Sequence, residues 1–176
     1  MPIKLKNVRI AFPHLFKRND KFCNPGEGKF EATFLLHKER DADLIKSIQD
    51  EIKSRIKNDL KQKSLPSDKI CLRDGDDSDR AEFAGHWTLK AANTRRPTVV
   101  DRKRNPLAEE DGAIYGGCWV NGMVDLWNQN NEYGKRINCN LLGVQFFKDG
   151  EPFGDSVTAC ADDFDMFDDD DEDIPF

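Results

Sequence analysis

The stretch Cys118-Trp119-Val120-Asn121-Gly122-Met123-Val124-Asp125-Leu126-Trp127 decides the fold that we expect of this chain. Successive side chains of a β-strand point to opposite faces, so alternation divides the stretch into two sets. The first set is apolar and is predicted to face a core: Cys118, Val120, Val124 and Leu126. The second set mixes two indoles with smaller side chains and is predicted to face outward: Trp119, Asn121, Met123, Asp125 and Trp127. The sequence therefore predicts a sheet with a filled inner face and an outer face that carries aromatic side chains.

Short strands separated by turn residues are predicted on both sides of this stretch. Alternation and β-forming side chains mark strands at residues 4–12, 30–36, 86–92, 98–100, 115–127 and 137–147. Pro13 is expected to end the first strand, because proline cannot donate to a ladder. Residues 64–82 contain a proline and clustered aspartates, and they are predicted to form a loop.

One long helix interrupts the strands. Apolar residues recur at every fourth position from Leu44 to Leu60, and Asp41 or Asp43 can cap the first turn. Basic and acidic residues alternate on the other face, which favours a solvated face over one that binds nucleic acid. Together these elements predict a mainly β (α+β) domain: a partly closed Greek-key barrel of the OB-fold type with one long helix. Periodicity alone does not separate this barrel from another β-barrel or an α+β sheet.

The charge of the chain is divided between a basic body and an acidic end. The 176 residues carry a net charge of −6, but residues 162–176 (DDFDMFDDDDEDIPF) hold nine acids and no base. The remaining body has 27 basic against 24 acidic residues, a net charge of +3. Because a block of like charges repels itself and cannot pack in a core, we expect a folded domain over residues 1–161 and a disordered interaction tail over residues 162–176.

Basic residues flank the predicted outward-facing aromatic strand. Neutralisation of phosphates by Lys and Arg dominates non-specific binding of nucleic acids, and aromatic faces stack on bases of any sequence. We therefore predict a site for single-stranded nucleic acid at the following residues: Trp119, Trp127, Tyr115, Tyr133, Lys90, Arg95, Arg96, Arg102, Lys103, Arg104, Lys135 and Arg136. Packing under a loop or against the helix would explain Trp119 and Trp127 equally well.

The sequence holds no pattern that is typical of an enzyme, a cofactor site or a metal site. The five cysteines are scattered and form no Cys-x-x-Cys pair, so we expect neither disulfides nor structural zinc, and a reducing compartment. The segment Gly26-Glu27-Gly28-Lys29 lacks the glycine spacing of a phosphate loop. Residues 73–80 lack the calcium-loop pattern, so a polar turn is favoured there over a metal loop. Since neither a signal peptide nor a long apolar run is found, we expect a cytoplasmic protein.

Several short motifs follow one another along the body. They are Arg73-Asp74-Gly75-Asp76, Gly85-His86-Trp87, Val99-Val100-Asp101-Arg102 with Asn105-Pro106, Tyr115-Gly116-Gly117-Cys118, and Asn140-Leu141-Leu142-Gly143-Val144-Gln145 followed by Asp149-Gly150-Glu151-Pro152 and Gly154. In this order they resemble the bacteriophage single-stranded DNA-binding proteins long catalogued as a domain of unknown function, over about residues 4–161. The resemblance implies an OB-fold that coats single-stranded DNA during phage replication or recombination in a bacterial host. It implies neither catalysis nor a cofactor.

The acidic end carries a second resemblance. The run from Phe167 to Phe176, in which acids precede Asp-Ile-Pro-Phe, is similar to the C-terminal tip of bacterial single-stranded DNA-binding proteins. This implies a segment that recruits replication and repair proteins through Asp171, Glu172, Asp173, Ile174, Pro175 and Phe176. An inert solubilising tail would need only the acids and leaves the apolar residues unexplained. We also hypothesise that the nine acids compete with DNA phosphates for the basic site when DNA is absent.

Two other classes of protein stay open at this point. One is a phage recombination protein that anneals strands or works with a nuclease, and the other is an acidic DNA mimic that inhibits a host factor. A mimic would spread carboxylates over its folded surface, whereas the body of this chain is net positive. The sequence also leaves open a homo-oligomer or cooperative assembly on DNA, the site size, and the preference for DNA over RNA.

Overall fold

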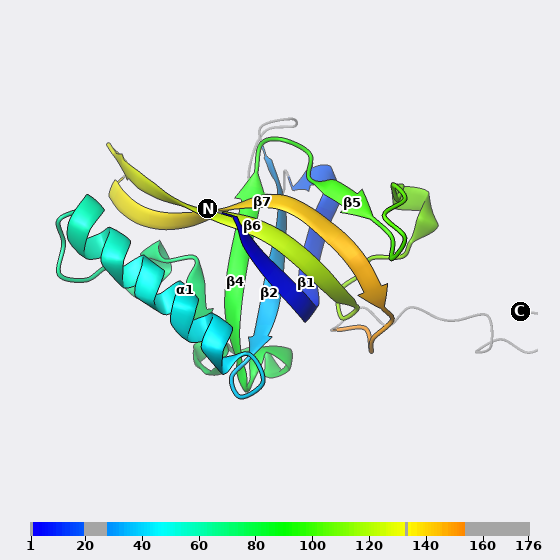
Figure 1. Ribbon diagram of the computed structural model, residues 1–176, viewed down its shortest axis with the longest axis horizontal. Coiled ribbons are helices and arrows are strands. Elements are labelled where there is room, and N and C mark those ends of the chain that lie inside the picture. The colour runs from blue at the N-terminus through cyan, green and yellow to red at the C-terminus, as the bar shows by residue number, and fades with distance from the viewer. Residues whose placement is uncertain (1, 20–27, 133, 154–176) are drawn as a thin grey trace, which may run out of the picture.

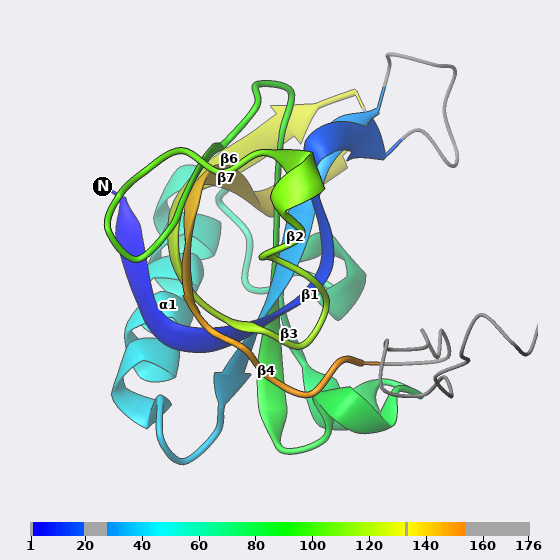
Figure 2. The ribbon, with the colours of Figure 1, turned by 90° about the vertical axis from the view of Figure 1, so that its right-hand side faces the viewer.

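Five strands form a closed barrel in the structure, which is a computed structural model that describes residues 2–19, 28–132 and 134–153. The barrel strands are β1 (Ile3–Asn19), β2 (Lys29–His37), β4 (His86–Asn93), β6 (Trp119–Asn131) and β7 (Gly134–Lys148). Two short strands extend the sheet at its ends, β3 (Leu72–Asp74) beside β4 and β5 (Thr98–Val100) beside β7. Figure 1 shows α1 lying beside the barrel strands, and Figure 2 looks nearly along the barrel. The expected OB-type barrel is confirmed.

The barrel closes through a narrow contact. Strand β1 pairs antiparallel with β2 and β6, β2 pairs with β4, and β6 pairs with β7. Closure comes from a parallel contact between β4 and β7, with Ala92 opposite Asn140. The Asn93 side chain adds a hydrogen bond to the carbonyl of Leu141 at 3.2 Å. The two edges of the sheet are therefore joined over a short length.

Strand β1 is longer than its sequence predicts. The prediction that Pro13 ends the strand was wrong, because β1 continues to Asn19. The pairing with β2 shifts register between Ala11 and His14, and Phe12 there has a φ of 51°. Pro13 thus lies in an irregularity of the ladder, which is where a strand tolerates a residue without an N–H.

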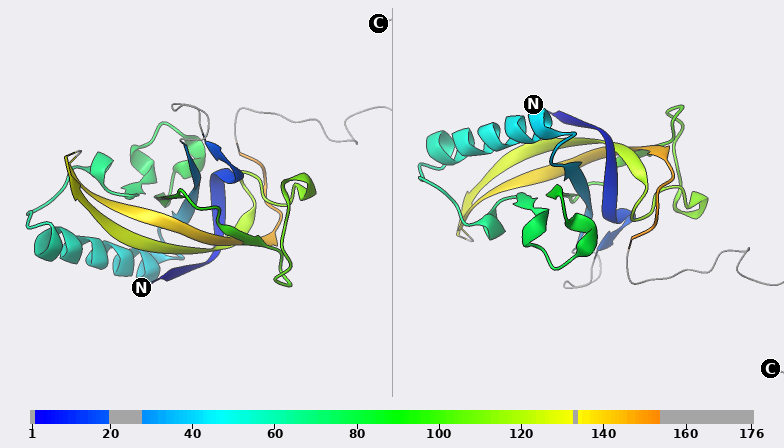
Figure 3. Two further views of the ribbon diagram at one scale, coloured as in Figure 1. Left: turned by 90° about the horizontal axis from the view of Figure 1, so that it is seen from above. Right: turned by 90° about the horizontal axis from the view of Figure 1, so that it is seen from below.

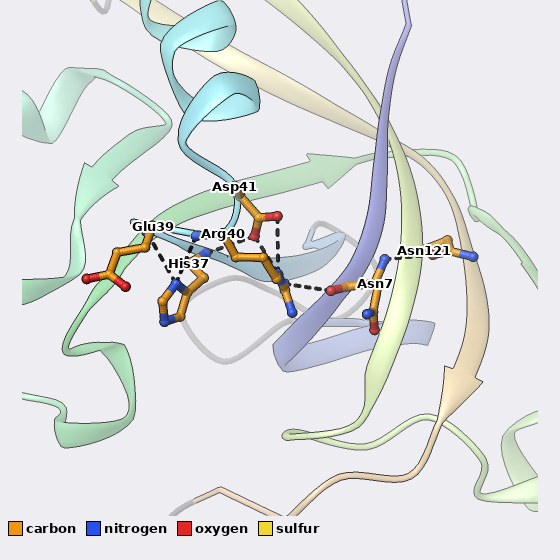
Figure 4. Close-up of polar contacts among 6 residues, drawn as sticks. All are labelled: Asn7, His37, Glu39, Arg40, Asp41 and Asn121. Carbon is orange, nitrogen blue, oxygen red and sulfur yellow. Dashed lines mark hydrogen bonds and ion pairs between the residues drawn. The ribbon is translucent and has the colours of Figure 1, made fainter.

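The predicted helix is present as α1 (Ala42–Ser54), followed by a π-helical turn at Arg55–Asp59. It packs on the barrel through the apolar residues at every fourth position, all buried: Ile48, Ile52, Ile56 and Leu60, with Ile45 beside them. Asp41 stands at the N-terminus, but its carboxylate accepts from the N–H of His37 at 2.9 Å rather than from a helical N–H (Figure 4). The residue predicted as a cap therefore fixes the turn that leads into the helix.

The predicted loop at residues 64–82 contains β3 and three short 3-10 turns, at Ser67–Lys69, Gly75–Asp77 and Ala81–Phe83; a fourth lies at Glu109–Asp111. The ammonium of Lys38 lies 2.7 Å from a carboxylate oxygen of Asp74 and also contacts Asp76. Hydrogen bonds from this ammonium lower the pKa of both carboxyl groups. The aspartate-rich loop is thus a polar turn, as predicted, with a lysine between its carboxylates.

The core confirms the alternation of β6. Cys118, Val120 and Val124 are fully buried, while Met123 on the opposite face is 36% exposed. Leu35 on β2 lies between the core residues Phe34 and Leu36 and so points to the outer face, yet it is buried, because Phe83 and Phe153 cover it from outside the barrel. Among the residues described, no helix is long and apolar enough to span a membrane.

Candidate nucleic-acid interface

A polar groove of about 560 Å³ lies over the closure of the barrel, between β4, the turn before β3 and the β6–β7 hairpin. Figures 1 and 3 show this hairpin running past the barrel alongside α1. Five of the lining residues are basic and one is acidic: Lys29, Lys69, Arg73, Lys90 and Arg136, with Asp68. Trp127 supplies the aromatic side chain, and the neutral polar residues are Asn93, Thr94, Gln129, Asn138 and Asn140.

The arginines of the polar groove are held mainly by backbone carbonyls. Arg73 donates to the carbonyls of Ile70 at 3.1 Å and Asp68 at 2.8 Å. Arg136 reaches the same carbonyl of Asp68 at 3.4 Å. Carbonyls orient a guanidinium without neutralising its charge. Lys90 has a distant carboxylate neighbour, Glu31, at 3.9 Å, and its side chain is 62% exposed. The groove therefore keeps a positive field for an anionic ligand.

Strand alternation places the indole and the amides on this surface. Trp127 pairs with Asn138 across the hairpin, and both point away from the core residues Leu126 and Cys139. The amide of Asn138 donates to the side-chain oxygen of Gln129 at 2.8 Å. The groove floor thus offers one aromatic face beside hydrogen-bonding groups.

The hairpin that forms one wall is braced against the end of the helix. Asn128 accepts from Arg55 at 3.1 Å and donates to Asp59 at 2.8 Å. The ammonium of Lys135 donates to the carbonyl of Leu60 at 2.9 Å. Since Arg55, Asp59 and Leu60 all lie at the π-helical turn, this turn holds the hairpin in place as a wall of the groove.

The structure brings together three of the predicted site residues in the polar groove: Trp127, Lys90 and Arg136. Arg95 lies next to the groove, with its backbone N–H bonded to Asn93. The others described lie elsewhere. Arg96 covers the ring of Phe16, Arg102 covers the ring of Phe147, Lys103 follows Asp101 in a turn, and Arg104 lines a different groove. Tyr133 and residues 171–176 lie outside the described residues.

Trp119 is separated from Trp127 and lies within a cluster of cations. Arg40 and Lys148 lie 5.2 Å from the centre of its ring, and Arg9 lies 5.8 Å away. We call Trp119 with these three cations the Trp119 cluster. Tyr115 lies beyond it, where its hydroxyl donates to the carbonyl of Gly150 at 2.9 Å. Tyr115 thus holds the segment that crosses the outside of the barrel.

Lys29, Lys69 and Arg73 are groove residues that the sequence analysis missed. They come from the start of β2, a 3-10 turn and β3. The prediction took basic residues near β6 in the chain, whereas closure of the barrel brings in these three from distant segments. Arg73 belongs to the motif Arg73-Asp74-Gly75-Asp76, but nothing in this motif indicates that Arg73 lines a groove.

Comparisons with known proteins agree with this fold. A family model described as Enterobacter phage Enc34, ssDNA-binding protein, matches residues 1–175. Protein p50 of Acyrthosiphon pisum secondary endosymbiont phage 1 is 39% identical over 174 residues, covering 94% of this chain and 93% of the relative. The structure of the single-stranded DNA-binding protein from bacteriophage Enc34 in complex with ssDNA matches with a TM-score of 0.78 and 38% identity, over 87% of this chain and 89% of that one.

A more distant structure shares the fold alone. The single-stranded DNA-binding protein gp2.5 of bacteriophage T7 matches with a TM-score of 0.54 at 17% identity, over 90% of this chain and 98% of that one. The family model matches nearly the whole chain, and two relatives are 38% and 39% identical to it, so the family of the chain is established. The chain belongs to the family of the Enc34 phage single-stranded DNA-binding protein.

Proposed function

We propose that this protein binds single-stranded DNA, without sequence preference, in the polar groove. The observation that carries the proposal is the set of five basic side chains around Trp127 at the closure of the barrel. This part of an OB-fold, beside the hairpin of its last two strands, is where such folds bind oligonucleotides. The family and its DNA-bound member add support.

The groove chemistry accounts for binding of any sequence. Lys and Arg neutralise phosphates and release counterions, which supplies affinity but no base discrimination. The indole of Trp127 can stack on any base, since every base has a π face. A single strand exposes its bases for this contact, whereas a duplex keeps them stacked inside. The groove therefore favours single strands.

In this role the protein coats and protects DNA during phage replication or recombination, in the cytoplasm of the host, and acts without catalysis. The body at residues 1–161 binds DNA, and the tail at residues 162–176 recruits replication or repair proteins. Ile174 and Phe176 anchor the tail to a partner, while the acids steer the encounter. Support for the tail comes from its sequence, since it lies outside the described residues.

Titration of the protein with poly-dT, followed by tryptophan fluorescence, tests the groove. Stacking on Trp127 is expected to quench the emission. Trp127→Ala should remove most of the quenching and weaken binding by about 1–3 kcal/mol, the usual worth of a stacked base. Trp119→Ala is the matched control, because it removes an indole of the same strand outside the groove. Quenching that survives Trp127→Ala and disappears with Trp119→Ala would place DNA on the Trp119 cluster instead.

The tail is expected to weaken DNA binding, because its nine acids compete with phosphates for the basic groove. Deletion of residues 162–176 should raise the affinity for poly-dT, most strongly at low salt. The measurement is a salt titration of both chains. Equal affinity at every salt concentration would remove the competition from the proposal.

A further inference from the structure

Two cysteines that are far apart in the sequence meet at the polar groove. Cys71 comes just before β3 and Cys139 lies in β7, and both line the groove. The N–H of Cys71 donates to the carbonyl of Ile137 at 3.0 Å, and Cys139 follows Ile137 by two residues on the same buried face of β7. The fold thus brings together two thiols that are scattered in the sequence.

The side chains of these two cysteines contact each other. The thiol of Cys139 donates a hydrogen bond to the sulfur of Cys71. This hydrogen bond lowers the pKa of Cys71 and raises the pKa of Cys139 well above its usual value. Both are free thiols, and Cys71 is 9% exposed against 3% for Cys139. Because the thiolate is the nucleophile, Cys71 is the thiol that reacts first, and Cys139 lies in position to react with its product.

The segment that carries Cys71 lies beside the closure of the barrel. On one side it adjoins β4, where the N–H of Lys90 donates to the carbonyl of Cys71 at 3.0 Å. On the other side Ile70 forms a parallel bridge with Ile137 of β7. A covalent bond from Cys71 to Cys139 would therefore connect β4 to β7 a second time, through side chains, close to the place where the two strands pair.

We propose that Cys71 and Cys139 form a redox site, at which an oxidant of the peroxide class converts the two thiols into a disulfide that reinforces the closure of the barrel. With hydrogen peroxide, the sulfur of Cys71 attacks one oxygen and the O–O bond breaks. The leaving oxygen takes up the proton of Cys71 and departs as water, and Cys71 becomes a sulfenic acid.

The second step forms the disulfide. The sulfur of Cys139 attacks the sulfur of Cys71, the S–O bond breaks, and the oxygen departs as water with the proton of Cys139. Two thiols are thereby oxidised, and one hydrogen peroxide is reduced to two waters. In a reducing compartment the pair rests as thiols, and the disulfide forms when peroxide accumulates.

Peroxide treatment of the full chain in the absence of DNA tests the redox site. The protein is reduced, freed of reductant and exposed to hydrogen peroxide, and the remaining thiols are then alkylated in denaturant. Mass spectrometry of a non-reducing digest should show peptides joined through Cys71 and Cys139, two hydrogens lighter than the reduced pair. Cys118, which is fully buried, should stay reduced. Because no DNA is present, failure of the proposed DNA binding would leave these results unchanged.

Serine variants separate the roles of the two sulfurs. In Cys139→Ser the sulfenic acid of Cys71 should persist and be trapped by dimedone, because the neighbouring thiol is gone. In Cys71→Ser the thiol of Cys139 should react with peroxide several-fold more slowly than Cys71 does, since it is the more buried of the two. The matched control is Cys23→Ser with Cys160→Ser, which removes two other thiols and should leave the disulfide unchanged.

The thermal stability of the oxidised protein tests the reinforcement of the barrel. A bond that closes the long loop between residues 71 and 139 restricts the unfolded chain, so peroxide should raise the melting temperature by about 5 °C or more. Dithiothreitol should reverse the rise. Neither variant, Cys71→Ser nor Cys139→Ser, should show it.

Bound DNA is expected to shield the redox site, because both thiols line the polar groove, and this expectation alone rests on the proposed function. Poly-dT should slow the oxidation of Cys71 several-fold in the unchanged protein and less in Trp127→Ala. If poly-dT leaves the rate unchanged although the disulfide forms without DNA, the proposed place of DNA in the polar groove is wrong and the redox site stands.

Other outcomes would overturn the proposal. Cys71 and Cys139 that both stay reduced under peroxide would show that the pair is inert. A disulfide between two copies of the chain, or one that uses Cys23 or Cys160 instead, would show that the redox site lies elsewhere. An unchanged melting temperature in the presence of the Cys71–Cys139 bond would show that the bond does not reinforce the barrel.

Discussion

Gly117 illustrates how single residues hold the outer layer of the barrel. Its φ of 113° is one that side chains rarely adopt, and a Cβ there would lie 2.2 Å from the carbonyl oxygen of Glu151. The neighbouring Gly116 has open space, with its nearest atom 4.0 Å away. Gly117 thus lets the segment up to Phe153 approach the barrel closely.

Gly117→Ala is therefore expected to destabilise the protein by about 2 kcal/mol or more, from backbone strain and the clash with Glu151. Gly116→Ala should change the free energy of unfolding by about 0.5 kcal/mol or less. Urea unfolding of the two variants checks the difference. Equal values would show that the crossing segment yields to a methyl group at little cost.

At the scale of elements, the hairpin of β6 and β7 depends on its contacts with the helix end. Asn128→Ala removes the side chain that joins Arg55 and Asp59, and leaves every charge of the polar groove in place. We expect faster amide hydrogen exchange along the hairpin and a fall of several-fold in affinity for poly-dT, because the wall of the groove loosens.

The control for this prediction is Asn58→Ala, which removes an amide that donates to the hydroxyl of Ser54 on the helix surface. Its exchange rates in the hairpin should match those of the unchanged protein. Unchanged exchange in Asn128→Ala would show that the contacts of Asn128 do not hold the hairpin.

Elements could be predicted from the sequence where one periodic pattern decides them. The inner face of β6 follows from local alternation and the buried stripe of α1 from apolar residues at every fourth position, and both are confirmed. The extension of β1 past Pro13 could not be predicted, because it depends on a bulge in a pairing with distant β2. The polar groove could not be predicted from the sequence for the same reason. Lys29, Lys69 and Arg73 become neighbours of Trp127 only when the barrel closes.

At the scale of the whole molecule, the cations of the polar groove predict how binding responds to salt. For single-stranded DNA, each phosphate neutralised contributes about −0.7 to the slope of log K against log salt. The five cations of the polar groove therefore give a slope no steeper than about −3.5. Lys90→Ala should make the slope less steep by about 0.7, while Lys46→Ala on the helix should not. Binding isotherms at four or more salt concentrations measure this. A slope that Lys90→Ala does not change would remove Lys90 from the interface.

The narrow closure of the barrel has a further consequence. Ala92 and Asn140, which join β4 to β7, also lie in the floor of the polar groove. A ligand that lies across this floor contacts both edges of the sheet, and it stabilises the closed form by mass action. Single-stranded DNA bound in the proposed site would then hold the two edges of the barrel together. The melting temperature of the protein should rise with oligonucleotide length only until the oligonucleotide spans both β4 and β7.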